Sequence, residues 1–377
     1  MRILQITPAY KPAYIYGGPT VSVALLCEQL ARDGSSIRVL TTTANGKSEL
    51  DIQPGLLQKV DGVTVTYFKR ITKDHTHFSP ALLYQAWKNV KRYDIVHIHG
   101  WWNTVSMLTA AIAKLRGIPY VISPRGMLSP YTFGNKNSGK KSILHRVLGK
   151  SLLQKSYIHT TSKNESLAVG RLTSARGLFE IPNFISLNNP VTTTEHTHRK
   201  ELRMVFFSRI EEKKGLDLLI EALSNVRIPY SLTIAGDGEP SYIDRLKILS
   251  KKNGSMQNLE WTGFRTGNKF SYLAGFDLMV LPSYDENFGN VVVESLSVGT
   301  AVLISKQVGL SDYVDANGLG WICDTETGSI TNMINKAGEN VEKLERIRQI
   351  APDKIRQDFS SQALLQKYNA MYSTILR

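Results

Sequence analysis

Cysteine is scarce in this chain of 377 residues, which contains only Cys27 and Cys323. The two lie far apart in the sequence, so neither a disulfide framework nor a cysteine metal site is expected. The chain also lacks any uninterrupted apolar run of about eighteen residues, and so no membrane-spanning helix is predicted. Residues 1–8 lack the layout of a signal peptide and instead indicate a strand. We therefore expect a cytoplasmic protein.

Acidic residues are few in the first half of the chain. Residues 1–200 contain 26 Lys and Arg against 10 Asp and Glu, whereas residues 201–377 contain 20 against 22. The first half therefore carries the whole net charge of +14. Solubility does not require this asymmetry, but a negatively charged partner does, such as an anionic membrane, a lipid-linked phosphate or nucleic acid. Because the cations do not interleave with aromatic residues as in recognised nucleic-acid modules, we expect no nucleic-acid partner.

Strand-like apolar runs alternate with helical patterns along the chain, which is typical of parallel α/β architecture. In the first half, strands are predicted at Ile3–Ile6, Ile37–Thr41, Val63–Tyr67, Ile95–His97, Tyr120–Ile122, Tyr157–Thr160 and Leu178–Ile181, and helices at Thr20–Asp33, Pro80–Asn89, Asn103–Leu115 and Ser142–Lys155. In the second half, strands are predicted at Met204–Ser208, Tyr230–Ala235, Leu259–Thr262, Leu278–Leu281, Ala301–Ile304 and Gly320–Ile322, and helices at Leu216–Leu223, Tyr242–Lys251, Lys269–Leu273, Val291–Val298 and Thr331–Asn340. A polar linker, 188–200, separates two predicted Rossmann-like domains, 1–187 and 201–360.

The segment 281–305 combines a strand end, a loop, a helix-like run and a second strand. Glu286 lies in the loop and Glu294 in the helix-like run, with seven residues between them. If a helix starts near Gly289, both carboxylates can face the carboxyl end of a parallel strand, where open α/β sheets bind ligands. The backbone N–H groups of residues 288–291 would then form an anion site. The alternative is a carboxylate that favours a helix start, beside an ordinary surface glutamate.

This segment closely resembles the E-x7-E signature of the retaining family 4 glycosyltransferases, which have the GT-B fold. The resemblance implies two Rossmann-like domains with parallel sheets facing across a cleft, and a last helix, within 361–377, that crosses back to the first domain. It implies that Glu286 contacts the donor sugar and Glu294 the ribose of the nucleotide. The residues between them that would complete the donor site are Asn287, Phe288, Gly289 and Asn290.

The turn Phe207-Ser-Arg-Ile-Glu-Glu-Lys-Lys-Gly215 follows a predicted strand and precedes a helix. Two cations at the carboxyl end of a strand suit a diphosphate, although a solvated charged turn is the alternative. The turn resembles the family's G-R-L…K-G motif, with Ser208 in place of the usual glycine. That resemblance implies that Arg209 and Lys214 hold the diphosphate.

Glycines after other strands give further candidates. Gly236 allows a tight turn and close backbone approach. The paired glycines Gly17 and Gly18 would let backbone amides approach a phosphate, unless they form a simple helix-start turn. The resemblance implies that this Gly-Gly loop faces the donor diphosphate and the acceptor. It also implies that the region of Gly263, Phe264 and Arg265 lines the pocket of the nucleotide base, whereas Phe264 could instead be a core aromatic residue.

Two histidines and one arginine are candidates in the first half. Period two places His97 and His99 on the same face of a strand, with His99 nearer its exposed end. We expect His97 to be a core histidine and His99 to contact the acceptor or the sugar. Arg125 stands in Ser-Pro-Arg-Gly, where many family members have a histidine; bacterial polysaccharide-building members look similar here. Arg125 would bind a phosphate of the donor or of a lipid-phosphate acceptor, unless it is structural.

No cofactor or metal ion is expected. No third ligand accompanies the two histidines, and the chain lacks the Asp-x-Asp motif that clamps metal and diphosphate in the rival GT-A fold. The basic segment 136–155 is amphipathic, and it could rest on an anionic membrane or pack its apolar stripe on the sheet.

The resemblance as a whole implies a retaining, metal-independent glycosyltransferase (EC 2.4) of bacterial cell-surface polysaccharide biosynthesis. Its donor would be a nucleotide-sugar, with UDP favoured over GDP, and its acceptor a glycan or lipid-linked glycan. Peripheral contact of the basic first domain with the membrane would suit such an acceptor. Alternatives are an epimerase or another enzyme of the same fold, and a non-catalytic protein that binds an anionic ligand or nucleic acid.

Overall fold

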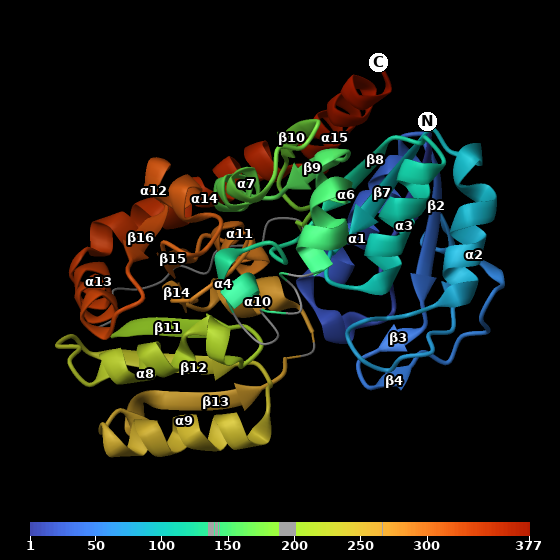
Figure 1. Cartoon of the computed structure of the whole chain (residues 1–377). Helices are drawn as coiled ribbons and strands as arrows, with labels where there is room; N and C mark the ends of the chain where they lie inside the picture. The colour runs from blue at the N-terminus through green and yellow to red at the C-terminus, as the bar shows by residue number, and fades with distance from the viewer. Residues whose placement is uncertain (135–138, 140–141, 143, 188–200, 266) are drawn as a thin grey trace. The chain divides into compact units, whose positions relative to one another are not determined.

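The computed structural model describes the whole chain except residues 135–138, 140–141, 143, 188–200 and 266 (Figure 1). The predicted linker, 188–200, and part of the predicted helix from Ser142 lie outside the described residues. The chain forms two compact units: unit 1 comprises Met1–Ile185 and Ser361–Arg377, and unit 2 comprises Ser186–Ser360. Both are built on a largely parallel sheet covered by helices, so the predicted α/β class is confirmed.

Unit 1 contains an eight-stranded sheet in the order β10-β9-β8-β7-β1-β2-β6-β5. All neighbours are parallel except β5 and β6. The strands are β1 (Arg2–Ile6), β2 (Ser36–Thr42), β5 (Leu57–Val60), β6 (Val63–Phe68), β7 (Ile95–His99), β8 (Tyr120–Ser123), β9 (Tyr157–Thr160) and β10 (Gly177–Glu180). The chain runs from β1 outward through β2 to one edge and from β7 outward to the other. The strand order therefore reverses between β1 and β7, and ligands of such sheets bind beside this switch point.

Alternate residues of these strands enter two separate cores. Ile3 of β1 packs with α1 (Gly18–Arg32) and α15 (Ser361–Leu376) on one face of the sheet. Leu4 packs on the other face with α2 (Pro80–Asn89), α3 (Thr104–Leu115) and α6 (Lys150–Gln154). This alternation follows from the period of two in a strand, and burial on both faces explains the apolar runs of the sequence.

Unit 2 contains a six-stranded parallel sheet in the order β13-β12-β11-β14-β15-β16. Its strands are β11 (Leu202–Phe207), β12 (Tyr230–Ala235), β13 (Leu259–Gly263), β14 (Leu278–Leu281), β15 (Ala301–Ser305) and β16 (Gly320–Cys323). Its helices are α8 (Leu216–Leu223), α9 (Pro240–Lys252), α10 (Lys269–Ala274), α11 (Asn290–Leu296), α12 (Ser311–Ala316), α13 (Thr327–Glu339) and α14 (Val341–Phe359). Counted from β11, this is the 3-2-1-4-5-6 order of dinucleotide-binding folds, with its switch point between β11 and β14.

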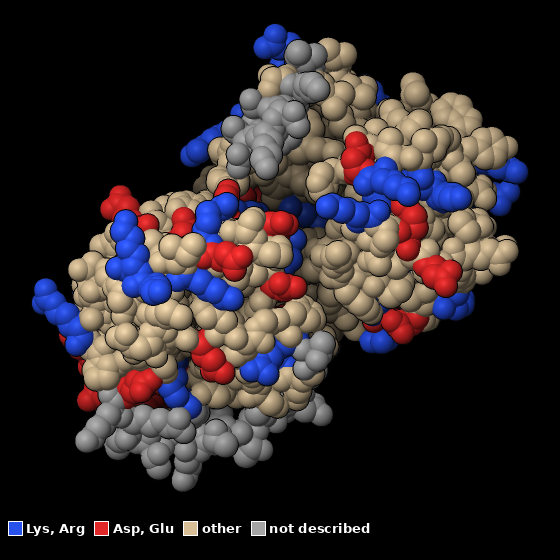
Figure 2. All heavy atoms as spheres, turned by 90° about the horizontal axis from the view of Figure 1, so that it is seen from below, with Lys and Arg blue, Asp and Glu red and all other residues tan. Residues whose placement is uncertain are grey.

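The surface shows both signs of charge. On the face in Figure 2, basic side chains (blue) and acidic side chains (red) lie among one another. Within the described part of the chain, no helix is long and apolar enough to cross a membrane.

Candidate active site

The switch point of unit 2 brings the predicted cations and one carboxylate together. Lys214, in the loop after β11, forms an ion pair with Glu286, in the loop after β14. The amide of Tyr284 donates a hydrogen bond of 2.8 Å to the carbonyl oxygen of Lys213, which ties the two loops together. Arg209 lies near the start of the same loop. Its side chain is half exposed, and its guanidinium is 2.7 Å from the carboxylate of Glu211. The arrangement suits a diphosphate, because both cations are held at the carboxyl end of β11, next to the loop after β14.

Glu286 is fixed from both sides and stays ionised. Its amide donates to the carbonyl oxygen of Gln307 (3.2 Å), and its carbonyl oxygen accepts from the amide of Gly309 (2.8 Å). Burial acts to raise the pKa of Glu286, but the ion pair with Lys214 and the nearby charges of Lys213 and Arg209 outweigh it. The net result is a pKa below the ordinary value of a glutamate, so Glu286 carries its charge at neutral pH.

Two glycines allow the loops to meet. Gly215 has a left-handed backbone (φ 69°), and a Cβ atom there would overlap the carbonyl oxygen of Pro282 in the loop after β14. A Cβ atom at Gly236 would overlap the carbonyl oxygen of Ser208 in the loop after β11. Glycine at these positions therefore allows the backbone approach on which the site depends. The close backbone approach predicted at Gly236 is therefore an approach to the backbone of Ser208.

Replacing Gly236 with alanine is expected to lower the free energy of unfolding of unit 2 by about 3 kcal/mol, because the loop after β12 must move off the loop after β11. Urea denaturation measures the change. Gly328, in the first turn of α13, is the matched control, since no atom lies within 4 Å of a Cβ built there. The Gly328→Ala variant should be as stable as the wild type; equal stability of the two alanine variants would contradict the overlap.

The second glutamate lies on α11. Glu294 is buried, and its carboxylate is 2.6 Å from Nζ of Lys269 on α10. Gly289, the residue before α11, has a left-handed backbone (φ 89°), and the helix begins beside it, as predicted. Phe288 is buried with its ring packed edge-on against Phe359, so a donor contact from it would come from the backbone.

The remaining residues that are predicted to bind the nucleotide-sugar lie in loops or next to them. Asn287 is half-buried in the loop before α11, and Asn290 is the first residue of that helix. At the end of β13, Gly263 is followed by Phe264, which is 74% exposed. The alternative that Phe264 is a core aromatic residue is therefore wrong. Arg265 lies over the ring of Tyr272, with 5.0 Å between the guanidinium carbon and the ring centre.

In unit 1, the predicted glycines lie in the loop after β1, at that sheet's switch point. Gly17 (φ 69°) ends a short turn, Tyr14–Tyr16, and Gly18 begins α1. Tyr16 accepts a hydrogen bond of 3.0 Å from the amide of Gly46. That contact connects the glycine loop to the hairpin formed by β3 (Ala44–Asn45) and β4 (Ser48–Glu49).

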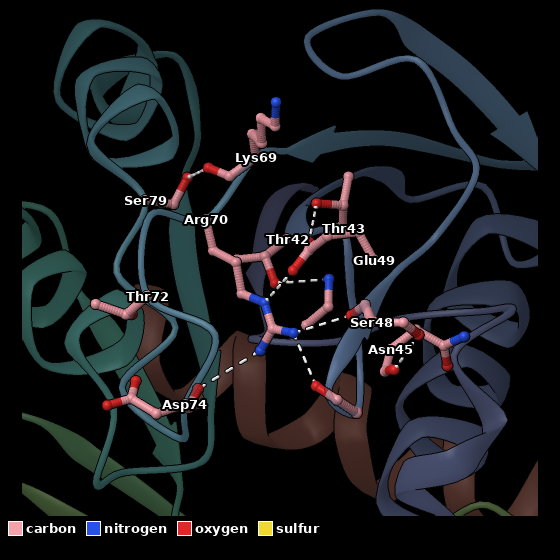
Figure 3. A network of polar contacts seen from close by, with 12 residues as sticks. Thr42, Thr43, Asn45, Ser48, Glu49, Lys69, Arg70, Thr72, Asp74 and Ser79 are labelled. Carbon is pink, nitrogen blue, oxygen red and sulfur yellow. Dashed lines mark hydrogen bonds and ion pairs between the residues drawn. The ribbon is translucent and has the colours of Figure 1, made fainter.

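The hairpin is held by Arg70, which the sequence did not single out. Figure 3 shows its buried guanidinium at the centre of a polar network. Its Nε lies 2.6 Å from a carboxylate oxygen of Glu49, and its Nη2 donates to the carbonyl oxygens of Gly46 (2.8 Å) and Ser48 (3.0 Å). A single arginine among polar residues gives no sequence signal for such a role.

The two histidines lie inside unit 1, on the sheet face that packs against α15. Arg125 (φ 53°) donates from Nε to Nδ1 of His99 at 3.3 Å. Because an arginine can only donate, His99 is neutral with its proton on Nε2, and it donates to Oε1 of Gln5 at 2.7 Å. The amide nitrogen of Gln5 then donates to the hydroxyl of Tyr372 on α15. His99 thus has both ring nitrogens bound by the protein and supports Arg125.

The chain of hydrogen bonds continues in the same direction. The hydroxyl of Tyr372 donates to Nδ1 of His97, whose Nε2 donates to Ser123; each distance is 2.7 Å. Ser123 donates to Nδ1 of His159 at 2.6 Å, and Nε2 of His159 donates to the carbonyl oxygen of Ile181 at 2.8 Å. That oxygen can only accept, so both ends of the chain dictate one direction. His97 is therefore a satisfied core histidine, as expected.

All three histidines are kept neutral. Burial, with the charge of Arg125 nearby, lowers the pKa of His97 and His99 well below 6.5 and that of His159 to about 3. Arg125 also donates from Nη1 to Ser22 (3.1 Å) and Asn183 (2.8 Å), so α1 and the segment after β10 hold it. Among the described residues, no group of three or more His, Cys, Asp and Glu side chains is placed to hold a metal ion.

Sequence comparison finds glycosyltransferase families in both halves. Residues 17–178 match a family described as "Glycosyl transferase 4-like domain", and residues 193–354 match "Glycosyl transferases group 1". An uncharacterized glycosyltransferase of Methanocaldococcus jannaschii is 25% identical over 356 residues, covering 88% of this chain and 87% of that protein.

Structure comparison finds the same fold. Sucrose-phosphate synthase from Thermosynechococcus elongatus superposes with a TM-score of 0.78 at 17% identity, covering 100% of this chain and 99% of that one. Anabaena HepE, solved in complex with UDP and glucose, superposes with a TM-score of 0.74 at 19% identity, covering 99% and 100%. At these identities, the likeness shows the GT-B fold.

Proposed function

Since the chain belongs to the family 4 glycosyltransferases of the GT-B fold, we propose that it is a retaining enzyme that moves a sugar from a UDP-sugar to a glycan or lipid-linked acceptor. The observation that carries this proposal is the junction of Arg209, Lys214 and Glu286 at the switch point of unit 2. Two cations at this position attract a diphosphate, whereas they would not attract a neutral or cationic ligand.

In this proposal, Arg209 and Lys214 hold the donor diphosphate and balance the charge that grows on it as it leaves. They supply the positive charge that a metal ion supplies in other transferases, so no metal is needed. Glu286 orients the sugar and Glu294 the ribose. The base lies near Gly263, Phe264 and Arg265, and Phe264 is exposed enough to stack on it.

UDP is favoured because a structural relative, HepE, was solved with UDP and with UDP-glucose. We assign the acceptor to unit 1, where Gly17 and Gly18 lie in the switch-point loop after β1 and Arg125 lies in the loop after β8. The positive charge of the first half and the Ser-Pro-Arg-Gly segment favour a phosphate-bearing, lipid-linked acceptor of cell-surface polysaccharide synthesis. Such an acceptor is met at the cytoplasmic face of a membrane.

Retention follows if the acceptor attacks on the face from which the diphosphate leaves. The bond from the sugar carbon to the phosphate oxygen breaks, a bond to the acceptor oxygen forms, and the leaving phosphate takes the acceptor's proton. No protein base is then required. This suits a site in which His99 has both ring nitrogens occupied.

Thermal stabilisation by UDP, GDP and ADP tests the donor site. UDP at a hundred times its dissociation constant should stabilise the wild-type protein by about 2.7 kcal/mol. The Arg209→Ala variant should lose most of this shift, because the diphosphate loses a charged partner.

Arg245→Ala is the control, since Arg245 is an exposed arginine of the same unit, on α9. Its shift with UDP should equal that of the wild type. A larger shift with GDP or ADP would overturn the choice of UDP, and an unchanged shift in Arg209→Ala would overturn the diphosphate role.

A further inference from the structure

One surface of unit 1 is made of helical segments that carry basic residues and no acidic ones. It is formed by α2 with the turn Val90–Arg92, by α3, and by α6 with the π-helical turn His145–Gly149. Counting each helix with its C-cap residue, there are three Lys and Arg on the first segment, two on the second and three on the third, and no Asp or Glu on any of them. We call this surface the basic helical face.

Large apolar side chains are exposed among these cations. Tyr84 and Trp87 lie one turn apart on α2, with 66% and 43% of their surface exposed. Leu115 ends α3 and is 75% exposed, and Val147, next to α6, is 78% exposed. Side chains that remain apolar and solvent-exposed on three neighbouring helices form a patch that folding alone does not require.

Direct contacts show that the patch is continuous. The guanidinium of Arg116, after α3, lies 4.7 Å from the ring centre of Trp87 on α2. Nζ of Lys114 on α3 donates a hydrogen bond of 2.7 Å to Ser151 on α6. Ser151 lies one helical turn from Val147, so the apolar residues and the cations form one surface across the three helices.

The composition of this face differs from that of α9 in unit 2. On α9 of unit 2, Lys247, Lys251 and Lys252 accompany an exposed Ile248, but Asp244 lies on the same helix. The basic helical face has the cations and the aromatic residues without the acids.

We infer that the basic helical face docks on an anionic lipid bilayer. Trp and Tyr favour the membrane interface, where the ring is buried and the polar edge meets the headgroups. Lys and Arg around them meet lipid phosphates, and each cation near an anionic surface strengthens binding. The inference rests on the proposed function in one respect, namely that the acceptor is linked to a lipid.

The structure also settles how the amphipathic segment 136–155 contributes, as far as its residues are described. Leu152 is buried in the core with α3, and Leu148 packs against that core. Leu144 and Val147 stay exposed. The predicted stripe therefore divides between the sheet and the solvent, and α2 and α3 supply most of the docking surface.

Vesicle sedimentation of the full chain is the test. Phosphatidylglycerol–phosphatidylcholine vesicles at low salt should bind the wild type, and pure phosphatidylcholine vesicles should bind it weakly. Replacing Lys88, Lys91 and Arg92 with glutamine should weaken binding to the anionic vesicles roughly a hundredfold. The matched control replaces Lys247, Lys251 and Lys252 with glutamine, which removes the same charge from unit 2 and should leave binding within about twofold.

A second variant, Tyr84→Ser with Trp87→Ser, separates a membrane from a soluble polyanion such as heparin or DNA. It should lose binding to anionic vesicles at least tenfold and keep any binding to heparin. Undiminished vesicle binding by this variant would overturn the inference. Equal losses of vesicle binding in the two triple-glutamine variants would also overturn it. UDP stabilisation measured on the same variants should be unchanged, so failed docking can be told apart from a failed donor site.

Discussion

Replacing Lys214 with methionine is expected to lower donor-dependent release of nucleoside diphosphate by a hundredfold or more. Lys214 is a buried cation at the switch point of unit 2, and it is ion-paired with Glu286. A fixed charge that meets the growing negative charge of a leaving group typically contributes two to three orders of magnitude in rate. The variant also leaves Glu286 without its main partner. A coupled assay of free UDP measures the loss.

The same variant should change the pH dependence in a defined direction. In the wild type, burial raises the pKa of Glu286, but Lys214 together with Lys213 and Arg209 outweighs burial and holds that pKa below its ordinary value. Without Lys214, burial acts against the weaker influence of Lys213 and Arg209, so the pKa rises. Protonation of Glu286 then begins at higher pH, and the acidic limb of the pH–activity profile moves to higher pH.

Lys213→Met is the matched control, because Lys213 adjoins Lys214 but forms its ion pair with Asp285, at 3.5 Å, and acts on Glu286 only as a nearby charge. It should retain activity within about fivefold, since a partly exposed ion pair contributes little. If Lys213→Met and Lys214→Met lose activity equally, the loop acts through its total charge and not through the pair with Glu286.

The site of unit 2 could be predicted because its chemistry is local in the sequence. The strands that end at the switch point are short apolar runs, and each is followed directly by its functional loop. Arg209 and Lys214 lie on one such loop and Glu286 on another, so strand order alone brings them together. The strands named from the sequence agree with the structure to within two residues.

Several helices could not be predicted in the same way. α7 (Lys163–Leu172), α12 and α14 were missed, and the helix predicted from Thr331 begins at Thr327. α14 contains Pro352 and many charged residues, which conceals its apolar stripe. Its buried residues, such as Ile347 and Ile355, are at helical spacing. The sequence alone does not show which apolar residues of this segment are the buried ones.

The polar layer of unit 1 was missed for a different reason. Gln5, Ser123 and His159 lie on three strands, and Tyr372 lies about 370 residues from the start of the chain. Each was an isolated polar residue in an apolar run. The available signal was that Gln5, His97, Ser123 and His159 all lie at alternate positions, on one face of adjacent strands. Strand order, which the sequence did not give, was needed to use it.

That polar layer should make unit 1 sensitive to acid. His97, His99 and His159 are neutral in the folded chain, where burial lowers their pKa values, whereas unfolded histidines titrate near 6.5. Below that pH the unfolded state binds more protons, so the free energy of unfolding must fall as pH falls. The loss continues toward pH 3, the pKa of His159 being about 3. Each histidine contributes about 1.4 kcal/mol per pH unit, or about 2 kcal/mol between pH 7 and pH 5.

Hydrogen exchange of peptides from β1 and β7, measured across a urea series at several pH values, follows this unit alone. His97→Gln removes one of the three titrating groups of the polar layer and should reduce the slope by about one proton, or 1.4 kcal/mol per pH unit. His75, an exposed histidine of the same unit, gives the control: His75→Asn should leave the slope unchanged. Equal slopes in the wild type and both variants would mean that these histidines can take up protons without unfolding. The hydrogen-bond chain from Arg125 to Ile181 would then not be fixed in the neutral form.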